Sequence, residues 1–554
     1  MKFFIAICVG LSVLPSAAAS YPYYCSKMNA DVPSSYFRDM PRIPELDPTI
    51  VASSGAKILS ASALIRHGAR TPYESSFCWS GYHTDESQYV WDCSNSIVMT
   101  TAPTSSSTYT SDSNLLFKKV YDALTEPLAN ELDGTCHVGQ LIEEGVKQET
   151  RNGEQLRSSY VGDGDLKLFS SDDSFLQGSG SNGIPRTHVK FRGDDQQRTL
   201  QSGQLLVEAL FPTTEDQSGS ENVLVDWHTS DYGSDPIYPN SYICPKLTEL
   251  QNEATSSSEF IAVNTSASAL KLNSILDSDL GGADWRHILD CQMTSICTDR
   301  SIPSSIDDFG ADDDDSIFTQ IYDHASWQLA YVYQYNNNAH AKLSMAPVLK
   351  EVLETSLTPS LTSASTSDML DKGKPLLSIY SGHDTTIMPI LSALNIWDGA
   401  WAPYASLITI ETYHVTQSGS FPTGRAFRIC YNGEAMTEKF GGCEGGGELC
   451  DLNVLVDYLD FATFDRDCEV EDNNEDNGVG GGECEGKRGM STPAWIFVCF
   501  ILMSAASVTT AFVVTGSKFQ AWMSGDKNFA NLDDDELRHF GGERQVEGVS
   551  RSSS

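Results

Sequence analysis

The sequence predicts an α/β protein built on a doubly wound sheet. An apolar run at 58–65 (ILSASALI) leads directly into Arg66-His67-Gly68-Ala69-Arg70, as a buried strand does when it carries functional groups at its carboxyl end. A second apolar run at 375–380 (PLLSIY) leads in the same way toward His383-Asp384, and an apolar helical pattern follows it. A doubly wound sheet can bring two such strand ends together, so we expect one site there.

The first strand end has the residue types of an anion site. Arg66 and Arg70 lie four residues apart, and two guanidinium groups around one spot suit a phosphate or a carboxylate. His67 lies between them, and a neutral imidazole is a competent nucleophile toward phosphorus. Gly68 permits a tight turn or a close approach of the backbone to a ligand. A strand that simply ends in a solvated basic turn is the structural alternative.

Three segments resemble one known family. Residues 66–72 have the form R-H-G-x-R-x-P, which resembles the signature of the histidine acid phosphatases, a branch of the phosphoglycerate-mutase-like superfamily. The run S-G-H-D-T-T at 381–386 resembles the second motif of the family, and 192–200 resembles its arginine-bearing segment. The resemblance extends from about 57 to 468. It implies a mixed sheet flanked by helices, with a mainly helical cap domain.

The resemblance also implies roles for individual residues. His67 is expected to attack phosphorus and form a phosphohistidine, and Asp384 is expected to protonate the leaving alkoxide. The remaining residues are expected to hold the phosphate oxygens: Arg66, Arg70, Arg192 and His383. No cofactor is expected, because the arginines supply the positive charge that a metal ion supplies in other phosphatases. No C-x-x-C is present either, so the sequence gives little support for a zinc site.

The arginine-bearing segment departs from the family at one point. By position, Arg192 matches the strand-end arginine that reaches the phosphate, and Arg198 matches a helical arginine with a structural role. The family usually has Ser-Thr after the first arginine, where this chain has Gly193-Asp194. Asp194 or its neighbour Asp195 is predicted to cap the following helix.

The charge of the chain limits its partners. Among 554 residues, 75 are acidic and 36 are basic, which gives a formal net charge of -39. A surface of this sign repels polyanions, so nucleic acid is not expected as a partner. Because basic residues are scarce, the pair Arg66 and Arg70 is more informative here than it would be in a basic protein.

Two apolar segments indicate secretion and membrane anchoring. Residues 1–19 have the pattern of a signal peptide, with a small-residue cleavage site. Residues 493–515 carry no charge and are long enough to cross a bilayer. We therefore expect a single-pass type I protein with a lumenal or extracellular ectodomain, in the lysosome, endosome or vacuole or at the cell surface. An acidic, glycine-rich stalk (469–492) would precede the span, and a cytoplasmic tail (516–554) would follow it.

The ectodomain carries two further signs of secretion. Apart from Cys8 in the signal peptide and Cys499 in the span, it contains twelve of the 14 cysteines, which predicts a disulfide framework. Asn264 begins a glycosylation sequon. The expected domains are a catalytic core in two parts, 20–212 and 368–468, with the helical cap at 213–367 between them.

The sequence thus predicts a membrane-anchored acid phosphatase that hydrolyses phosphate monoesters. Two alternatives remain: a phytase-like phosphatase of inositol phosphates, and a catalytically silent binding protein on the same fold. Loss of His67 or Asp384 would be expected in a silent protein, and both residues are present. A homodimer is plausible by family resemblance alone.

Overall fold

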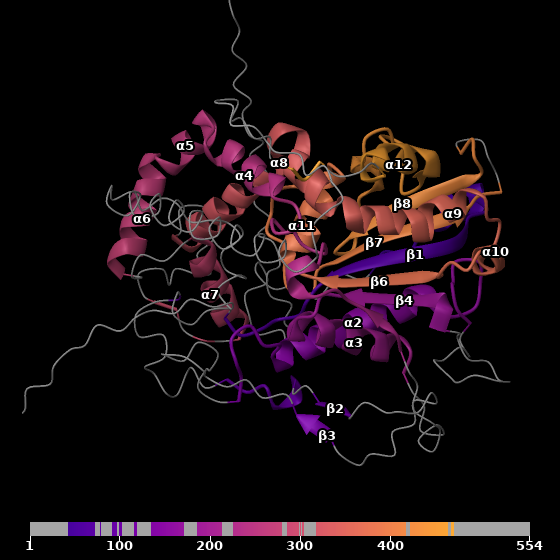
Figure 1. Ribbon diagram of the computed structural model, residues 1–554. Helices are drawn as coiled ribbons and strands as arrows, with labels where there is room; N and C mark the ends of the chain where they lie inside the picture. Colours follow the sequence, from indigo (N-terminus) through magenta and orange to yellow (C-terminus); the bar gives the residue numbers. More distant parts are fainter. Residues whose placement is uncertain are drawn as a thin grey trace, which may run out of the picture. The chain divides into compact units, whose positions relative to one another are not determined.

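The computed structural model in Figure 1 describes most of the expected catalytic core and cap. It covers residues 43–72, 78, 91–96, 99–101, 116–118, 135–170, 186–212, 225–279, 285–298, 300, 302–303, 317–416, 421–463 and 467–469. The expected signal peptide, the membrane span, the tail and nearly all of the stalk lie outside these residues. Among the helices that are described, none is both long and apolar enough to cross a membrane.

A mixed sheet forms the centre of the described structure. Its main strands follow the order β10-β8-β7-β1-β6-β4-β5, and β9 pairs with β8. Four strands pair in parallel: β1 (Lys57–Arg66), β6 (Leu377–Gly382), β4 (Val189–Gly193) and β5 (Trp227–His228). The other four join the sheet through antiparallel pairs: β7 (Leu407–His414), β8 (Arg425–Tyr431), β9 (Glu434–Ala435) and β10 (Cys450–Asp451). The mixed α/β architecture confirms the predicted fold class.

Strand β1 lies in the middle of this sheet and is covered on both faces. Every residue of β1 after Lys57 is buried, as expected for a near-continuous apolar run between two helical layers. The register brings three carboxyl ends to one edge, since Arg66 lies opposite Gly382 of β6, and Gly193 of β4 lies opposite Ser381. The functional residues predicted at separate strand ends therefore meet at this edge.

Helices cover both faces of the sheet (Figure 1). On one face lie α2 (Glu143–Tyr160) and α3 (Gln197–Leu210), which pack against each other. A Cβ on Gly153 of α2 would lie 2.2 Å from the carbonyl oxygen of Leu206, so this glycine is required for the close helix contact. The other face and the edge carry short helices: α9 (Thr358–Leu361), α10 (Thr366–Asp371), α11 (Asp384–Ala393) and α12 (Leu452–Tyr458). A further short helix, α1 (Pro48–Ser54), precedes β1 in the chain.

A second group of helices lies beyond the end of the sheet (Figure 1). It comprises α4 (Lys246–Thr255), α5 (Ser258–Asn264), α6 (Ala267–Asp279), α7 (Trp285–Cys297) and the long α8 (Ile317–Val352). Helix α8 is interrupted at Tyr335–Asn338, where three successive asparagines have φ of 49°, 58° and 61°. Asparagine tolerates this left-handed conformation better than most residues. The amide of Asn338 also donates to the Ser392 carbonyl of α11 at 2.7 Å.

Disulfides connect distant parts of the described chain. They join Cys78 to Cys291, Cys93 to Cys136, Cys244 to Cys468 and Cys443 to Cys450. The expectation of a disulfide framework is therefore confirmed, although Cys430 is a buried free thiol. A separate small sheet of β2 (Met99–Thr101) and β3 (Leu116–Lys118) lies between Cys93 and Cys136 in the chain.

Candidate active site

The backbone that carries His67 is held from both sides of β1. The His67 N–H donates to the Gly382 carbonyl of β6 at 2.9 Å, and the Ala405 N–H donates to the His67 carbonyl at 3.0 Å. The Gly68 N–H donates to Ser202 Oγ of α3 at 3.1 Å. The segment after β1 is thus hydrogen-bonded to its surroundings although it is no longer part of the sheet. This fixes the position of the imidazole.

Helix α2 approaches the same segment through a pair of glycines. A Cβ on Gly68 would lie 2.5 Å from the carbonyl oxygen of Gly145, and a Cβ on Gly145 would lie 2.2 Å from the carbonyl oxygen of Ala69. Neither position has room for a side chain. Glycine has a low helix propensity, so its presence inside α2 at position 145 is explained by this contact with the segment that carries His67.

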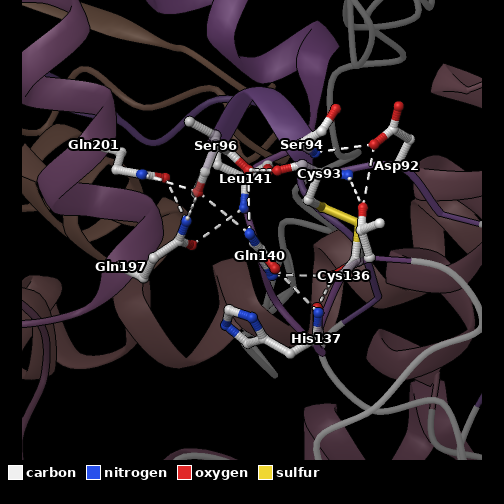
Figure 2. The surroundings of a disulfide bond; sticks show 12 residues. Asp92, Cys93, Ser94, Ser96, Cys136, His137, Gln140, Leu141, Gln197 and Gln201 are labelled. Carbon is white, nitrogen blue, oxygen red and sulfur yellow. Dashed lines mark hydrogen bonds between the residues drawn. A yellow bond between two sulfur atoms is a disulfide. The ribbon is translucent and has the colours of Figure 1, made fainter. Parts of the chain in front are cut away.

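A hydrogen-bonded cluster beside the Cys93–Cys136 disulfide supports the chain just after Arg70 (Figure 2). The Thr71 N–H donates to the Gln140 carbonyl at 2.9 Å, and the Gln140 N–H returns a bond to Thr71 Oγ1 at 3.0 Å. The carbonyl of Ser96 accepts the side-chain amides of Gln140, Gln197 and Gln201, at 3.3, 3.0 and 2.9 Å. Because Gln197 opens α3, this cluster links the end of the first motif to the helix that carries Arg198.

His67 has the protonation state that a nucleophile requires. Its Nδ1 lies 2.8 Å from the Gly68 carbonyl oxygen, which can only accept, so Nδ1 carries the proton and Nε2 keeps a lone pair. The side chain is buried. Burial, followed by the charges of Arg198, Arg66 and Arg70, holds the pKa of His67 well below its ordinary value. The imidazole therefore stays neutral in moderately acidic solution.

Asp384 is anchored on Arg66. Its Oδ2 lies 2.9 Å from Arg66 Nη2 and accepts the Trp401 indole N–H at 2.9 Å. Burial alone would raise the pKa of this carboxyl, but Arg66 and Arg70 lower it below its ordinary value. The Arg66 guanidinium also stacks on the Tyr404 ring, 4.2 Å from the ring centroid. Asp384 is thus held in place by Arg66, and its lowered pKa keeps it ionised unless acid or a bound substrate favours its protonated form.

Arg70 is paired with a residue of the second helical group. Its Nη1 lies 3.0 Å from Oδ2 of Asp290, which belongs to α7. Burial would lower the pKa of Arg70, but the carboxylates of Asp290 and Asp384 raise it above its ordinary value. Arg70 therefore keeps its charge although it is buried.

His383 contacts an aspartate where the family has a hydroxyl residue. Its Nε2 lies 2.7 Å from Oδ2 of the fully buried Asp194, which also accepts the Thr199 hydroxyl. Burial would raise the pKa of Asp194, but the interaction with His383 lowers it overall. The helix cap predicted for Asp194 or Asp195 is not formed, since the residue before α3 is Gln196 and makes no side-chain cap bond. Asp194 instead orients His383, whose ring centroid lies 5.5 Å from that of His67.

The two arginines of the β4–α3 segment lie in different surroundings. Arg192 Nη2 lies 2.6 Å from Oδ1 of the buried Asp235. The largest charge effects on His67 come from Arg198, Arg66, Arg70 and His383, in that order. Arg192 is thus paired with Asp235, whereas Arg198 has the largest charge effect on His67.

The three predicted arginines and His383 each lie against one carboxylate. The pairs are Arg66–Asp384, Arg70–Asp290, Arg192–Asp235 and His383–Asp194. Buried charges require such partners, because an unpaired charge is costly to remove from water.

Sequence reasoning did not assign four residues of the site: Tyr404, Asp235, Asp290 and Trp401. Tyr404 lies in the short run P-Y-A-S at 403–406, between the two predicted strand ends and the next strand. Asp235, Asp290 and Trp401 carry no local pattern, and only the tertiary contacts identify them. Within the ranges that the structure describes, no group of three or more His, Cys, Asp or Glu side chains is arranged to hold a metal ion.

Comparison with known proteins identifies the family. The profile of the histidine phosphatase superfamily (branch 2) matches residues 57–432, which is more than half of the chain. The protein belongs to this family, as its motifs predicted. Counting factor 60 of Dictyostelium discoideum is 26% identical over 445 residues, covering 80% of this chain and 90% of its own. Lysosomal acid phosphatase of Rattus norvegicus is 24% identical over 349 residues, covering 62% of this chain and 75% of its own.

Solved structures give a weaker likeness. The multiple inositol polyphosphate phosphatase of Bifidobacterium longum, in complex with inositol hexasulfate, is 12% identical and has a TM-score of 0.44. The match covers 79% of this chain and 97% of that one. The phytase of Citrobacter braakii is 13% identical with a TM-score of 0.43, covering 73% of this chain and 98% of its own. A likeness at this level supports no choice of substrate.

Proposed function

We propose that this protein is an acid phosphatase that hydrolyses phosphate monoesters through a phosphohistidine on His67. The neutral, buried imidazole with its free Nε2 lone pair is the single observation that carries the proposal. In the first step Nε2 attacks phosphorus and the bond from phosphorus to the alcohol oxygen breaks. Asp384 protonates the departing alkoxide. Water then attacks the phosphohistidine, Asp384 takes up a proton from it, and phosphate is released.

Acid favours this mechanism because Asp384 must hold a proton before the first step. In the free enzyme Arg66 and Arg70 lower its pKa, so it is ionised near neutrality. A bound phosphate adds negative charge beside the same arginines, which offsets their effect and raises the pKa of Asp384 in the complex. His67 remains neutral meanwhile. Activity should therefore rise as the pH falls, until His67 itself becomes protonated.

Three arginines are proposed to hold the phosphoryl group: Arg66, Arg70 and Arg198, with His383 as a fourth donor. For Arg198 this rests on its charge effect on His67, which exceeds that of Arg66. Arg192, assigned to the phosphate from the sequence, is proposed instead to support β4 through Asp235. Substituting an anion-stabilising donor typically costs about 10²–10³ in kcat. Arg198→Ala should show a loss of this size, and Arg192→Ala a smaller one if it folds.

The test is hydrolysis of p-nitrophenyl phosphate by the full-length protein in detergent, measured against pH with EDTA present. The expected result is activity that rises in acid and is absent in a folded His67→Ala variant. Rapid quenching into base should trap a labelled phosphoenzyme in the wild type only, because phosphohistidine survives base. Activity that persists in His67→Ala would refute the assignment of the nucleophile.

The leaving group separates the role of Asp384 from general damage. The p-nitrophenolate ion is a stable anion and leaves without a proton, whereas an alkoxide does not. Asp384→Asn should therefore lose ethyl phosphate hydrolysis by about 10²–10⁴, the usual contribution of a general acid, and lose much less with p-nitrophenyl phosphate. Equal losses on both substrates would contradict proton donation by this residue.

We further propose a lumenal or extracellular location, with a signal peptide at 1–19 and a membrane span at 493–515. The disulfides support an oxidising compartment. The predicted glycan acceptor Asn264 ends α5, where its Oδ1 accepts from His324 at 3.0 Å and from Gln328 at 2.6 Å. Mobility shifts after glycosidase treatment of wild type and Asn264→Gln would test the glycan. Homodimerisation remains a prediction from resemblance.

A further inference from the structure

Asp290 brings a carboxylate into the site from outside the sheet. It belongs to α7, whereas the other site residues come from strand ends and the segments next to them. Its Oδ2 bonds Arg70 at 3.0 Å, and the Tyr404 hydroxyl lies 3.4 Å from its Oδ1. The side chain is 17% exposed, so it is neither sealed in the core nor free in solvent.

The position of Asp290 is fixed by covalent and polar contacts. The next residue, Cys291, forms a disulfide with Cys78, which lies eight residues after Arg70 in the chain. The same helix contacts the site again through Thr294, whose hydroxyl lies 3.1 Å from that of Tyr404. Helix α7 is therefore tied to the segment that follows the first motif, and the Asp290 carboxylate stays at the site.

A chain of contacts joins Asp290 to the proton donor Asp384. Arg66 pairs with Asp384 and stacks on the Tyr404 ring, and the Tyr404 hydroxyl lies 3.4 Å from Oδ1 of Asp290. Asp384 must reach the alcohol oxygen to protonate it. The alcohol part of a bound monoester therefore extends into the field of Asp290.

We propose that Asp290 is a specificity-determining residue that selects phosphate monoesters whose alcohol carries an ammonium group, and disfavours alcohols that carry a second anion. This deepens the proposed function and rests on it. An ammonium group near the carboxylate gains attraction, while a carboxylate or further phosphate is repelled. At a separation of about 4 Å in surroundings between bulk water and a partly buried site, this attraction or repulsion corresponds to roughly tenfold in kcat/KM or more.

Three substrates of equal chain length test this in the full-length protein: O-phosphoethanolamine, ethyl phosphate and phosphoglycolate. Their alcohol parts end in an ammonium, a methyl and a carboxylate group. The wild type should prefer the amine over the acid, and Asp290→Asn should reduce that ratio of kcat/KM values about tenfold. Asp290→Glu should retain most of the preference. The ratio cancels any change in phosphate binding that the three substrates share, and any loss of folded protein.

Asp235→Asn is the matched control, because it also removes a carboxylate from an arginine. Its side chain is fully buried and lies at Arg192, so the ratio should stay as in the wild type. An unchanged ratio in Asp290→Asn would overturn the inference, and so would an equal change in Asp235→Asn. In either case, hydrolysis of ethyl phosphate by the wild type would leave the proposed function standing. If the wild type hydrolyses neither these three substrates nor p-nitrophenyl phosphate, both the inference and the proposed function are overturned.

Discussion

The contact between Gly145 and the catalytic segment can be tested by adding one methyl group. In Gly145→Ala the new Cβ would lie 2.2 Å from the Ala69 carbonyl oxygen, whereas ordinary contact begins at 3.4 Å. Helix α2 and the segment that carries His67 must therefore separate by about 1.2 Å. A misplacement of about 1 Å in catalytic geometry costs roughly 10²-fold. We expect Gly145→Ala to lower kcat/KM for p-nitrophenyl phosphate by about that factor.

Gly153 supplies the control within the same helix. A Cβ there would also lie 2.2 Å from a carbonyl oxygen, but from that of Leu206 in α3. Overpacking costs about 1–3 kcal/mol, and alanine returns about 1 kcal/mol of helix propensity, so both variants should lose similar stability. Thermal unfolding by circular dichroism checks this. Gly153→Ala should lose less than about tenfold in activity; equal losses in the two variants, or full activity in Gly145→Ala, would refute the reasoning.

Three further predictions concern stability. Tyr160→Phe removes a hydroxyl that donates to the buried Glu411 at 2.7 Å, and should cost about 1–3 kcal/mol in urea unfolding, more than a surface Tyr→Phe. Cys244→Ser opens a disulfide to Cys468 across 224 residues and should cost about 2–5 kcal/mol; an unchanged melting temperature would contradict it. Burial lowers the pKa of His340 to about 4, so between pH of about 6.5 and 4 only the unfolded chain takes up the proton. The free energy of unfolding should therefore fall by roughly 3 kcal/mol as the pH is lowered through this range, and His340→Gln should flatten that dependence.

The local sequence was sufficient for the elements that carry the chemistry. The apolar runs before Arg66 and His383 predicted two buried strands, and β1 and β6 lie parallel with those residues at their shared edge. The strength of this signal has a physical cause. A strand buried on both faces must be apolar throughout, so a polar or charged residue marks where it leaves the core.

The partners of these residues could not be predicted in the same way. Asp194 is separated from His383 by 189 residues and Asp290 from Arg70 by 220, and nothing near either aspartate indicates the pairing. By position in the family motif, the sequence assigned the phosphate to Arg192 and a structural role to Arg198. The structure engages Arg192 with Asp235 and leaves Arg198 as the arginine with the largest charge effect on His67.

By itself, the sequence determined the family and the fold class, and it predicted the nucleophile and the strand that carries it, because these depend on short contiguous patterns of polarity and residue type. Only the tertiary structure decided which carboxylate neutralises each cation, why Gly145 has no side chain, and that a helix outside the sheet contributes Asp290. Charge pairing and steric contact act through space over a few ångströms, and in a doubly wound sheet residues that close are often hundreds of positions apart in the chain.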